Sequence, residues 1–209
     1  MLTLCIDTAY KYLTVALIDD NKIVDSISLE CFKKQSEEVF VYLDELFKKA
    51  NLSKNDIDSV CISKGPGSYT GVRIAMTIAK VLCKVKDLKL YTISTLRLYA
   101  GNNKNTMVLM DARANRAYVG VYNNEKCLLK DCALELKDID KKDYDVVLDG
   151  SLIGLENKNP DIPNCFLNTK GMWEEVKDIN FLAPEYLKES NAYYRWYFLE
   201  WKLPILKTF

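Results

Sequence analysis

Histidine is absent from this chain of 209 residues. Its absence removes the commonest general base, the usual neutral metal ligand and the Ser-His and Cys-His nucleophile pairs, so a hydrolase becomes a poor hypothesis. An excess of charge is absent too, because 29 basic and 29 acidic residues give a formal net charge of zero. Global electrostatics therefore gives no reason to expect binding to nucleic acid or a membrane, and leaves only a local basic patch open.

Cysteine pairs and long apolar runs are also lacking. The seven cysteines are odd in number and scattered, without a CxxC pair, and Cys5, Cys61 and Cys83 sit in apolar runs. A disulfide scaffold and a zinc site are both poor interpretations, and no metal site is predicted. No run approaches the roughly 18 apolar residues of a membrane helix, and the N-terminus lacks a basic region before an apolar one. We expect a reduced, cytoplasmic, soluble protein.

Glycine is scarce, yet three of the eight glycines fall within residues 65–71, Gly-Pro-Gly-Ser-Tyr-Thr-Gly. A strand pattern over 58–63 precedes this stretch and a helix pattern over 72–85 follows it. The spacing fits neither a Walker loop nor the dinucleotide GxGxxG motif. Either the loop points backbone N–H groups at a phosphate or at another chain's backbone, or it is a tight turn into a helix capped by Ser68 or Thr70.

The remaining periodicity predicts an alternation of strands and helices. Strands are expected at 2–7, 13–18, 23–29, 89–93 and 144–148, and a short helix at 95–100. An amphipathic helix is expected at 36–50, capped by Ser36, with one apolar face made of Val39, Phe40, Leu43, Leu46 and Phe47. The first half thus has the order β-β-β-α-β-α-β. Residues 157–163 are expected to form a loop.

An internal repeat appears when the chain is shifted by 104 residues, because 3–24 then aligns with 107–128 without a gap. Each copy has an apolar strand ending in Asp, a polar connection, a second apolar strand and a turn rich in Asn and Asp. The repeat predicts two related lobes, 1–100 and 101–209, joined at 101–105. An aromatic segment from residue 183 to the C-terminus either packs over the domain or forms a base-stacking platform.

Several strings carry a resemblance. A three-stranded start ending its first strand in Asp, a duplicated lobe and the glycine-rich helix entry resemble the actin/Hsp70/sugar-kinase superfamily, an α/β class with the ASKHA, ribonuclease H-like fold and here a reduced second lobe. More narrowly, the chain resembles the bacterial threonylcarbamoyladenosine biosynthesis family TsaB, or YeaZ, over nearly its whole length. The strings that resemble it are Ile6-Asp7-Thr8-Ala9, Gly65 to Arg73, Ser94-Thr95-Leu96, Asp111-Ala112-Arg113 and Pro184-Glu185-Tyr186-Leu187.

That resemblance implies a non-catalytic subunit that binds and activates the threonylcarbamoyl transferase TsaD. With the ATPase TsaE, the complex would form threonylcarbamoyladenosine (t6A) at position 37 of tRNAs that read codons beginning with A. The subunit alone would bind no cofactor, whereas the complex would use ATP and Mg²⁺ and would contact tRNA. A homodimer would form when TsaD is absent. The implied interface lies on helices 36–50 and 70–85, at Val39, Tyr42, Leu43, Phe47, Val72, Ala75, Met76, Ala79 and Cys83.

Departures from ATP-using relatives leave a vestigial nucleotide site at Asp7, Thr8 and Asp111. The sequence after Asp7 has no glycine, so the Ala9 Cβ and the Tyr10 ring should crowd a phosphate. The histidine pair of the transferase cannot exist here, and Gln35 stands where many relatives have a histidine.

The alternative is an ATP-dependent kinase or phosphotransferase, with Asp7 as a metal-water ligand and the glycine loop (Gly65, Gly67, Ser68, Thr70, Gly71, Arg73) on phosphate. In the simpler interpretation Asp7 and Asp111 hold their turns through hydrogen bonds, and Arg73 is a solvated charge or reaches a phosphate or a partner's carboxylate. A glycoprotease, the third option, lacks a base or a metal set.

Overall fold

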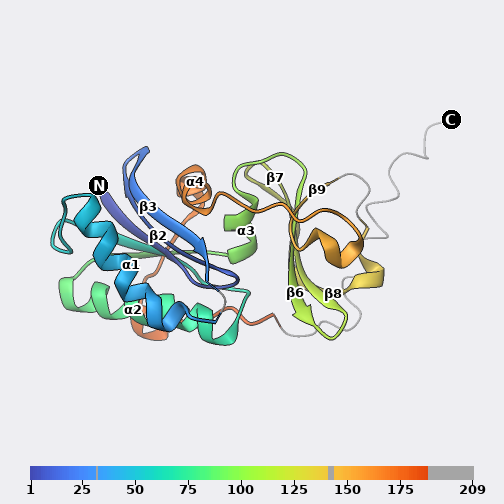
Figure 1. Ribbon diagram of the computed structural model, residues 1–209, viewed down its shortest axis with the longest axis horizontal. Coiled ribbons are helices and arrows are strands. Elements are labelled where there is room, and N and C mark those ends of the chain that lie inside the picture. Colours follow the sequence, from blue (N-terminus) through green and yellow to red (C-terminus); the bar gives the residue numbers. More distant parts are fainter. Residues whose placement is uncertain (32, 141–143, 188–209) are drawn as a thin grey trace.

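Two β-sheets lie side by side along the long axis of the molecule (Figure 1). The computed structural model describes residues 1–31, 33–140 and 144–187. The first sheet has the strand order β10-β5-β4-β1-β2-β3. Its strands are β1 (Leu2–Asp7), β2 (Tyr12–Asp19), β3 (Lys22–Glu30), β4 (Ser59–Ser63), β5 (Lys89–Ile93) and β10 (Glu174–Glu175). The first three strands form an antiparallel meander, and β4 and β5 run parallel to β1.

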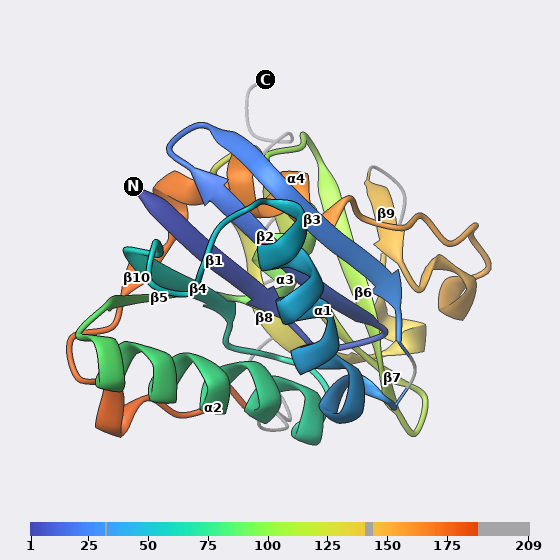
Figure 2. The same cartoon turned by 60° about the vertical axis from the view of Figure 1, so that its left-hand side comes forward.

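Helices cover both faces of the first sheet. α1 (Gln35–Lys49) and α2 (Tyr69–Lys86) lie together on one face (Figure 2), whereas α3 (Thr95–Ala100) and α4 (Ile162–Asn168) lie on the other. Strand residues alternate between the two faces: Leu4 and Ile6 pack under α1 and α2, and Cys5 packs with α3 and α4. Because both faces of the central strands are covered, β1, β2 and β4 are buried almost throughout and mostly apolar, whereas the edge strands β3 and β10 contain exposed charged residues.

The second sheet repeats the first at a shift of 104 residues. Its order is β8-β7-β6-β9, from β6 (Thr106–Arg113), β7 (Arg116–Asn123), β8 (Lys126–Glu135) and β9 (Asp145–Leu148). Shifted by 104, both ends of β2 coincide with those of β7. As in the first sheet, a meander is followed by a strand parallel to its first member. The two sheets thus share the strand pattern of the repeat, although Asp7 pairs with Thr14 and Asp111 with Ala117, a register shifted by one residue.

The second half is reduced, as expected. Where the first half has α1 between its third and fourth strands, the described part of the second has a 3-10 helix at Leu136–Asp138. Further 3-10 helices lie at Gly150–Ile153, Lys170–Met172 and Ile179–Phe181.

Residues 162–187 do not stay with the second sheet. α4 contacts β2 and β3, β10 pairs with β5, and the 3-10 helix at Ile179–Phe181 contacts α2. A core shared by the two halves also joins residues such as Ala16 and Leu96 to Val108 and Met110. Residues 162–187 therefore lie with the first sheet in space, although the predicted boundary at residue 100 places them in the second lobe.

Two local predictions differ from the structure, and a third lies mostly outside the described residues. α1 begins at Gln35 after Lys34, which makes no side-chain capping bond, so Ser36 is not the cap. α4 begins at Ile162, inside the stretch expected to be a loop, with Asp161 accepting a hydrogen bond from the Asn164 N–H at 3.2 Å. The predicted aromatic element lies mostly outside the described residues. Among the described helices, none combines the length and apolar character needed to cross a membrane.

Candidate functional site

The glycine loop, residues 65–71, packs against its own chain at the N-terminus of α2. A Cβ atom on Gly67 would lie 2.3 Å from the carbonyl oxygen of Ala9, and one on Gly71 would lie 2.1 Å from that of Thr8. The Ser68 N–H donates to the same Ala9 oxygen at 2.7 Å. The absence of side chains at these two glycines therefore lets the loop after β1 approach the backbone closely.

Ser68 is the N-cap of α2, as one of the two predictions had it. Its Oγ accepts a hydrogen bond from the Gly71 N–H at 3.3 Å. Thr8 ties the same turn to β1, because its hydroxyl donates to the Gly71 oxygen at 2.6 Å and accepts from the Ala75 N–H at 3.3 Å. Thr70 is exposed in the first turn. The interpretation as a tight turn into a capped helix accounts for these contacts.

Asp7 is fully buried at the end of β1. Its carboxylate accepts hydrogen bonds from the Ser63 hydroxyl, from the Tyr99 hydroxyl at 2.6 Å and from the Ala9 N–H at 3.2 Å. Burial raises the pKa of this carboxyl above its ordinary value, and the three hydrogen bonds oppose that rise. Such a carboxylate joins β1, β4 and α3, which is the structural role rather than that of an open metal-water ligand.

Asp111 is exposed and holds its turn in the way expected from the sequence. Its Oδ1 accepts a hydrogen bond from the Arg113 N–H at 2.7 Å. The sequence grouped Asp111 with Asp7 and Thr8, but only Asp111 of the three lines the pocket between the two sheets.

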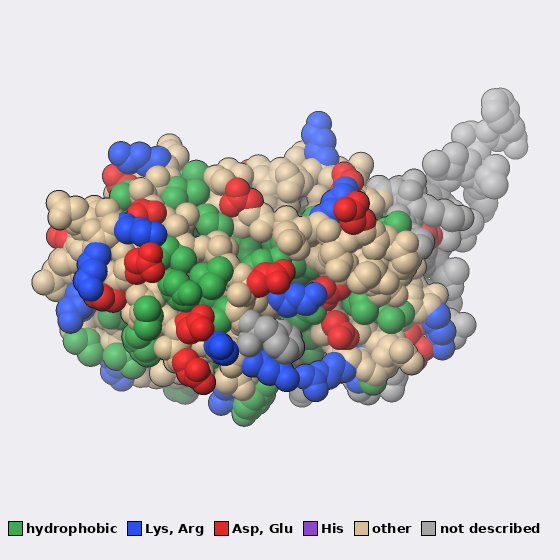
Figure 3. Space-filling view, in the orientation of Figure 1, with side chains coloured by type: hydrophobic (Ala, Val, Ile, Leu, Met, Phe, Trp, Pro, Cys, Tyr) green, Lys and Arg blue, Asp and Glu red, His purple; other side chains and the backbone are tan. Residues whose placement is uncertain are grey.

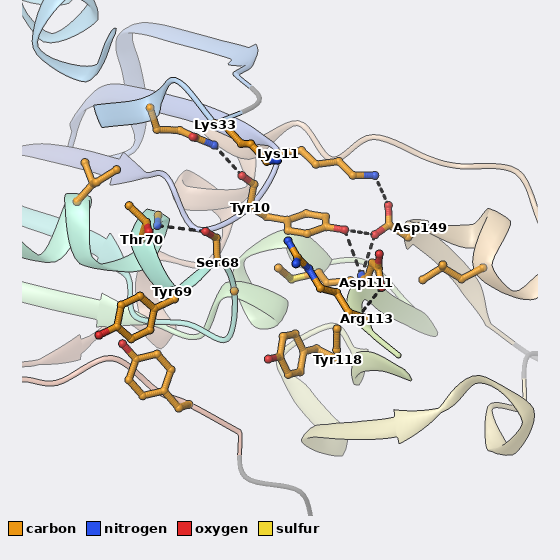
Figure 4. A pocket seen from close by; sticks show the side chains of 18 of the residues that line it. Tyr10, Lys11, Lys33, Ser68, Tyr69, Thr70, Asp111, Arg113, Tyr118 and Asp149 are labelled. Carbon is orange, nitrogen blue, oxygen red and sulfur yellow. Dashed lines mark hydrogen bonds and ion pairs between the residues drawn. The ribbon is translucent and has the colours of Figure 1, made fainter. Parts of the chain in front are cut away.

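Figure 4 shows the side chains that line this pocket. Its volume is about 960 Å³. It is lined by parts of both halves, including Tyr10, Lys11, Lys33, Ser68, Tyr69, Asp111, Arg113, Tyr118, Asp149 and Tyr186. Tyr10 extends from the β1–β2 connection across the pocket (Figure 4), and its hydroxyl donates to Asp149. Lys11 also pairs with Asp149. Burial, and after it the hydrogen bond to Asp149, raises the pKa of Tyr10.

Backbone and side chains at the turn after Asp7 have partners within the chain. The backbone of the turn after Asp7 contacts the glycine loop, and the Tyr10 side chain follows this turn. Lys11, one of the cations that line the pocket, pairs with Asp149. The sequence predicted that Tyr10 would crowd this region, but the partnership with Asp149 gave no sequence signal, because 139 residues separate the two.

Arg73 has partners within its own chain. Its guanidinium lies 4.3 Å from the Tyr69 ring centroid, and its Nε donates to the Tyr186 hydroxyl at 2.8 Å. Tyr186 in turn stacks on Tyr69, with centroids 5.7 Å apart. Gly65 completes this contact: its φ is +107°, and a Cβ there would lie 2.6 Å from the Glu185 oxygen. Two strings of the resemblance, at 65–73 and 184–187, are thus joined in space.

The expected interface residues lie mostly on the buried side of their helices. Seven of the nine are buried beneath α1 and α2, namely Val39, Leu43, Val72, Ala75, Met76, Ala79 and Cys83, and Tyr42 and Phe47 are half-buried against the same core. The apolar stripe of each helix packs on the first sheet, which leaves its buried members little surface for a partner.

Other apolar residues of these helices face outward. Phe40 and Val41 on α1 are 64% and 61% exposed, and Val81 and Val85 on α2 are 57% and 79% exposed. Phe40 therefore does not share the buried face on which the sequence placed it. Figure 3 shows apolar side chains at the surface of the half that carries these helices, among charges of both signs. The described residues contain no cluster of three or more Cys, Asp or Glu that could hold a metal ion.

The paired sheets, the shared cleft and the helices that cover the first sheet define an α/β protein of the actin/Hsp70-like class. A family model described as TsaD, tRNA N6-adenosine threonylcarbamoyltransferase, matches residues 30–149, more than half of the chain. The chain therefore belongs to the TsaD family, and within it to the TsaB, or YeaZ, group.

Individual relatives agree with this assignment. The TsaB protein of Bacillus subtilis is 26% identical over 227 residues, which cover 94% of this chain and 98% of that protein. The TsaB protein of Escherichia coli is 31% identical over 132 residues, covering 60% of this chain and 57% of the relative. A crystal structure of a Pseudomonas aeruginosa protein described as similar to the peptidase YeaZ superimposes with a TM-score of 0.77 at 18% identity, covering 90% and 99% of the two chains. This likeness concerns the fold.

Proposed function

We propose that this protein is a non-catalytic subunit in the biosynthesis of threonylcarbamoyladenosine in tRNA, and that it binds and activates a TsaD transferase. The relatives named for this biosynthesis, together with the match to the TsaD model, support the pathway. The contact between the glycine loop and the turn after β1 supports the non-catalytic role, because Gly67 and Gly71, which could let backbone approach a phosphate, face the chain's own backbone. The kinase alternative has no such support.

The docking face we propose is the outward side of α1 and α2, in place of the buried stripe. Phe40, Val41, Val81 and Val85 expose apolar surface there, which a partner's helices would cover. Charge adds selectivity. α2 contains Arg73, Lys80, Lys84 and Lys86 and no acidic residue. The first turn of α1 contains Glu37 and Glu38, whereas its Asp44 and Glu45 pair with Lys48 and Lys49. A partner with the opposite arrangement would fit this pair of helices.

The same face would pair two copies of this chain when TsaD is absent. TsaE, ATP and Mg²⁺ would enter through the complex, as would contact with tRNA.

The test places a charge on the exposed face and compares it with a charge elsewhere. Phe40→Glu and Val81→Glu should leave the monomer folded and abolish its complex with TsaD of the same organism, measured by light scattering after size exclusion. Leu155→Glu, at a 37% exposed position in the second half, is the matched control and should bind normally. Wild-type chain, but neither interface variant, should restore t6A to unmodified tRNA in the presence of TsaD and TsaE. Retention of the complex by both variants would exclude this face.

A further inference from the structure

Asp149 connects the two halves of the molecule across the cleft. It follows β9 and is only 3% exposed. Its carboxylate accepts hydrogen bonds from the Tyr10 hydroxyl and the Lys11 ammonium group, both on the β1–β2 connection, and from the Asp111 N–H at 2.9 Å. The Asp111 N–H also lies 3.1 Å from the Tyr10 hydroxyl oxygen. We call Tyr10, Lys11, Asp111 and Asp149 the clasp.

The first half holds its side of the clasp in place. The Gln35 side chain, 8% exposed at the start of α1, donates to the Tyr10 carbonyl oxygen at 2.9 Å. The Cys31 N–H donates to the Lys11 carbonyl oxygen at 2.8 Å. Two elements of the first half therefore fix the backbone from which the Tyr10 and Lys11 side chains extend. Gln35 also has a role here, where the sequence only marked it as a departure from relatives.

The second half holds Asp149 in a similar way. Its N–H lies 3.2 Å from the Leu109 oxygen, and the preceding Leu148 N–H donates to the Lys158 oxygen at 2.8 Å. Gly150 follows without a side chain, because a Cβ there would lie 2.3 Å from the Glu156 oxygen. These backbone contacts on both sides of Asp149 fix the position of its carboxylate.

A second set of contacts joins the halves elsewhere. The Ser94 hydroxyl at the start of α3 bonds to Asp131 of β8, which also accepts from Tyr122. Arg97 of α3 donates to the Asn124 oxygen at 2.6 Å and lies 4.7 Å from the centre of the Tyr122 ring. With the halves joined at two places, rotation about a hinge would break buried, charge-assisted hydrogen bonds.

We propose that the clasp is a built-in lock that holds the cleft at one fixed angle without any ligand. The chain's own Tyr10, Lys11 and Asp149 make bridging contacts between the halves of the kind that a ligand in a cleft could make. The protein then presents α1 and α2 on a rigid body. Ligand-driven hinge motion, which requires two packings of similar free energy, is suppressed.

Hydrogen–deuterium exchange of the full chain tests the lock. Asp149→Ala removes the acceptor and Tyr10→Phe removes one donor, whereas Asp145→Ala, at the start of the same strand, breaks only the surface pair with Lys158. We expect amides of residues 8–12 and 109–115 to exchange roughly tenfold faster or more in Asp149→Ala. In Tyr10→Phe they should exchange faster by a smaller factor. The Asp145→Ala control should match wild type, and amides of β1 and β4 should be unchanged in every variant.

Small-angle X-ray scattering on the same samples gives a second readout. The radius of gyration should rise in Asp149→Ala and stay constant in Asp145→Ala. The lock would be disproved if segments 8–12 and 109–115 exchanged at the wild-type rate in both clasp variants. Equal acceleration of all segments in both variants would disprove it too, since that pattern reports global unfolding rather than opening of the cleft.

Discussion

Gly71 lies where the first turn of α2 meets the loop after β1, and the contact leaves no room for a methyl group. A Cβ there would lie 2.1 Å from the Thr8 oxygen, a backbone atom that cannot rotate away. Gly71→Ala should therefore displace one of the two segments and lower the free energy of unfolding by roughly 1–3 kcal/mol or more. Urea denaturation followed by circular dichroism measures this loss.

Gly171 supplies the matched control for that substitution. A Cβ at this position would meet nothing within 4 Å. Gly171→Ala should be neutral or should stabilise by up to about 1 kcal/mol, because alanine restricts the unfolded chain. If the two variants had the same denaturation midpoint, the close approach of Gly71 to Thr8 would not be a constraint on this fold.

Helix α2 has an inner apolar surface in the core and an outer apolar surface that we propose binds a partner. Paired substitutions distinguish the two. Met76 is 4% exposed in the core under the helix, whereas Val81 is 57% exposed on its outer side. Met76→Ala should cost about 2–5 kcal/mol of folding free energy through the cavity that it leaves. Val81→Ala should change it by no more than about 0.5 kcal/mol.

Partner binding should show the reverse ranking. Val81→Glu weakens the complex while the melting temperature stays near that of wild type, whereas Met76→Glu lowers the melting temperature before it affects binding. A folded Met76→Glu variant of normal stability that fails to bind would restore the buried stripe as the interface.

The sequence predicted the positions of several strands and helices, but not which surface each helix buries. β1 and β5 were predicted to the residue, since short apolar runs between turn signals are distinctive. The apolar stripes of α1 and α2 were also identified, but periodicity does not say whether a stripe packs on its own sheet or on a partner. Val81 and Val85 are exposed one turn apart, but single apolar residues are common on protein surfaces, so their positions in the sequence did not indicate an interface.

The features that the sequence did not predict depend on contacts between residues far apart in the chain. β10 has two residues and is a strand only because it pairs with β5, more than 80 positions earlier in the chain. The clasp joins Tyr10 to Asp149, and nothing in the sequence links these two residues to each other. The glycine loop was located from the sequence, whereas its partner, the loop at Thr8 and Ala9, emerged only when the two were placed together.

For the whole molecule, buried thiols make stability depend on alkaline pH. Burial raises the pKa of Cys83 to about 11 and those of Cys132 and Cys165 to about 12, from an ordinary value of 9.0. Above pH 9 the unfolded chain therefore releases protons that the folded chain retains. The folded state then binds more protons than the unfolded state, and the free energy of unfolding falls as pH rises.

Each pKa unit corresponds to about 1.4 kcal/mol, so the effect is large once several thiols contribute. Under reducing conditions the urea midpoint should be steady from pH 7 to 8.5 and fall steeply between pH 9 and 10.5. Replacing the buried Cys132 and Cys165 by alanine should flatten that fall, although it lowers the midpoint at neutral pH. Cys127→Ala, at an exposed position, should alter the fall much less. An unchanged alkaline slope in the double variant would show that other groups, such as the buried Tyr99 and Tyr122, control it; the pKa values of both are raised by burial.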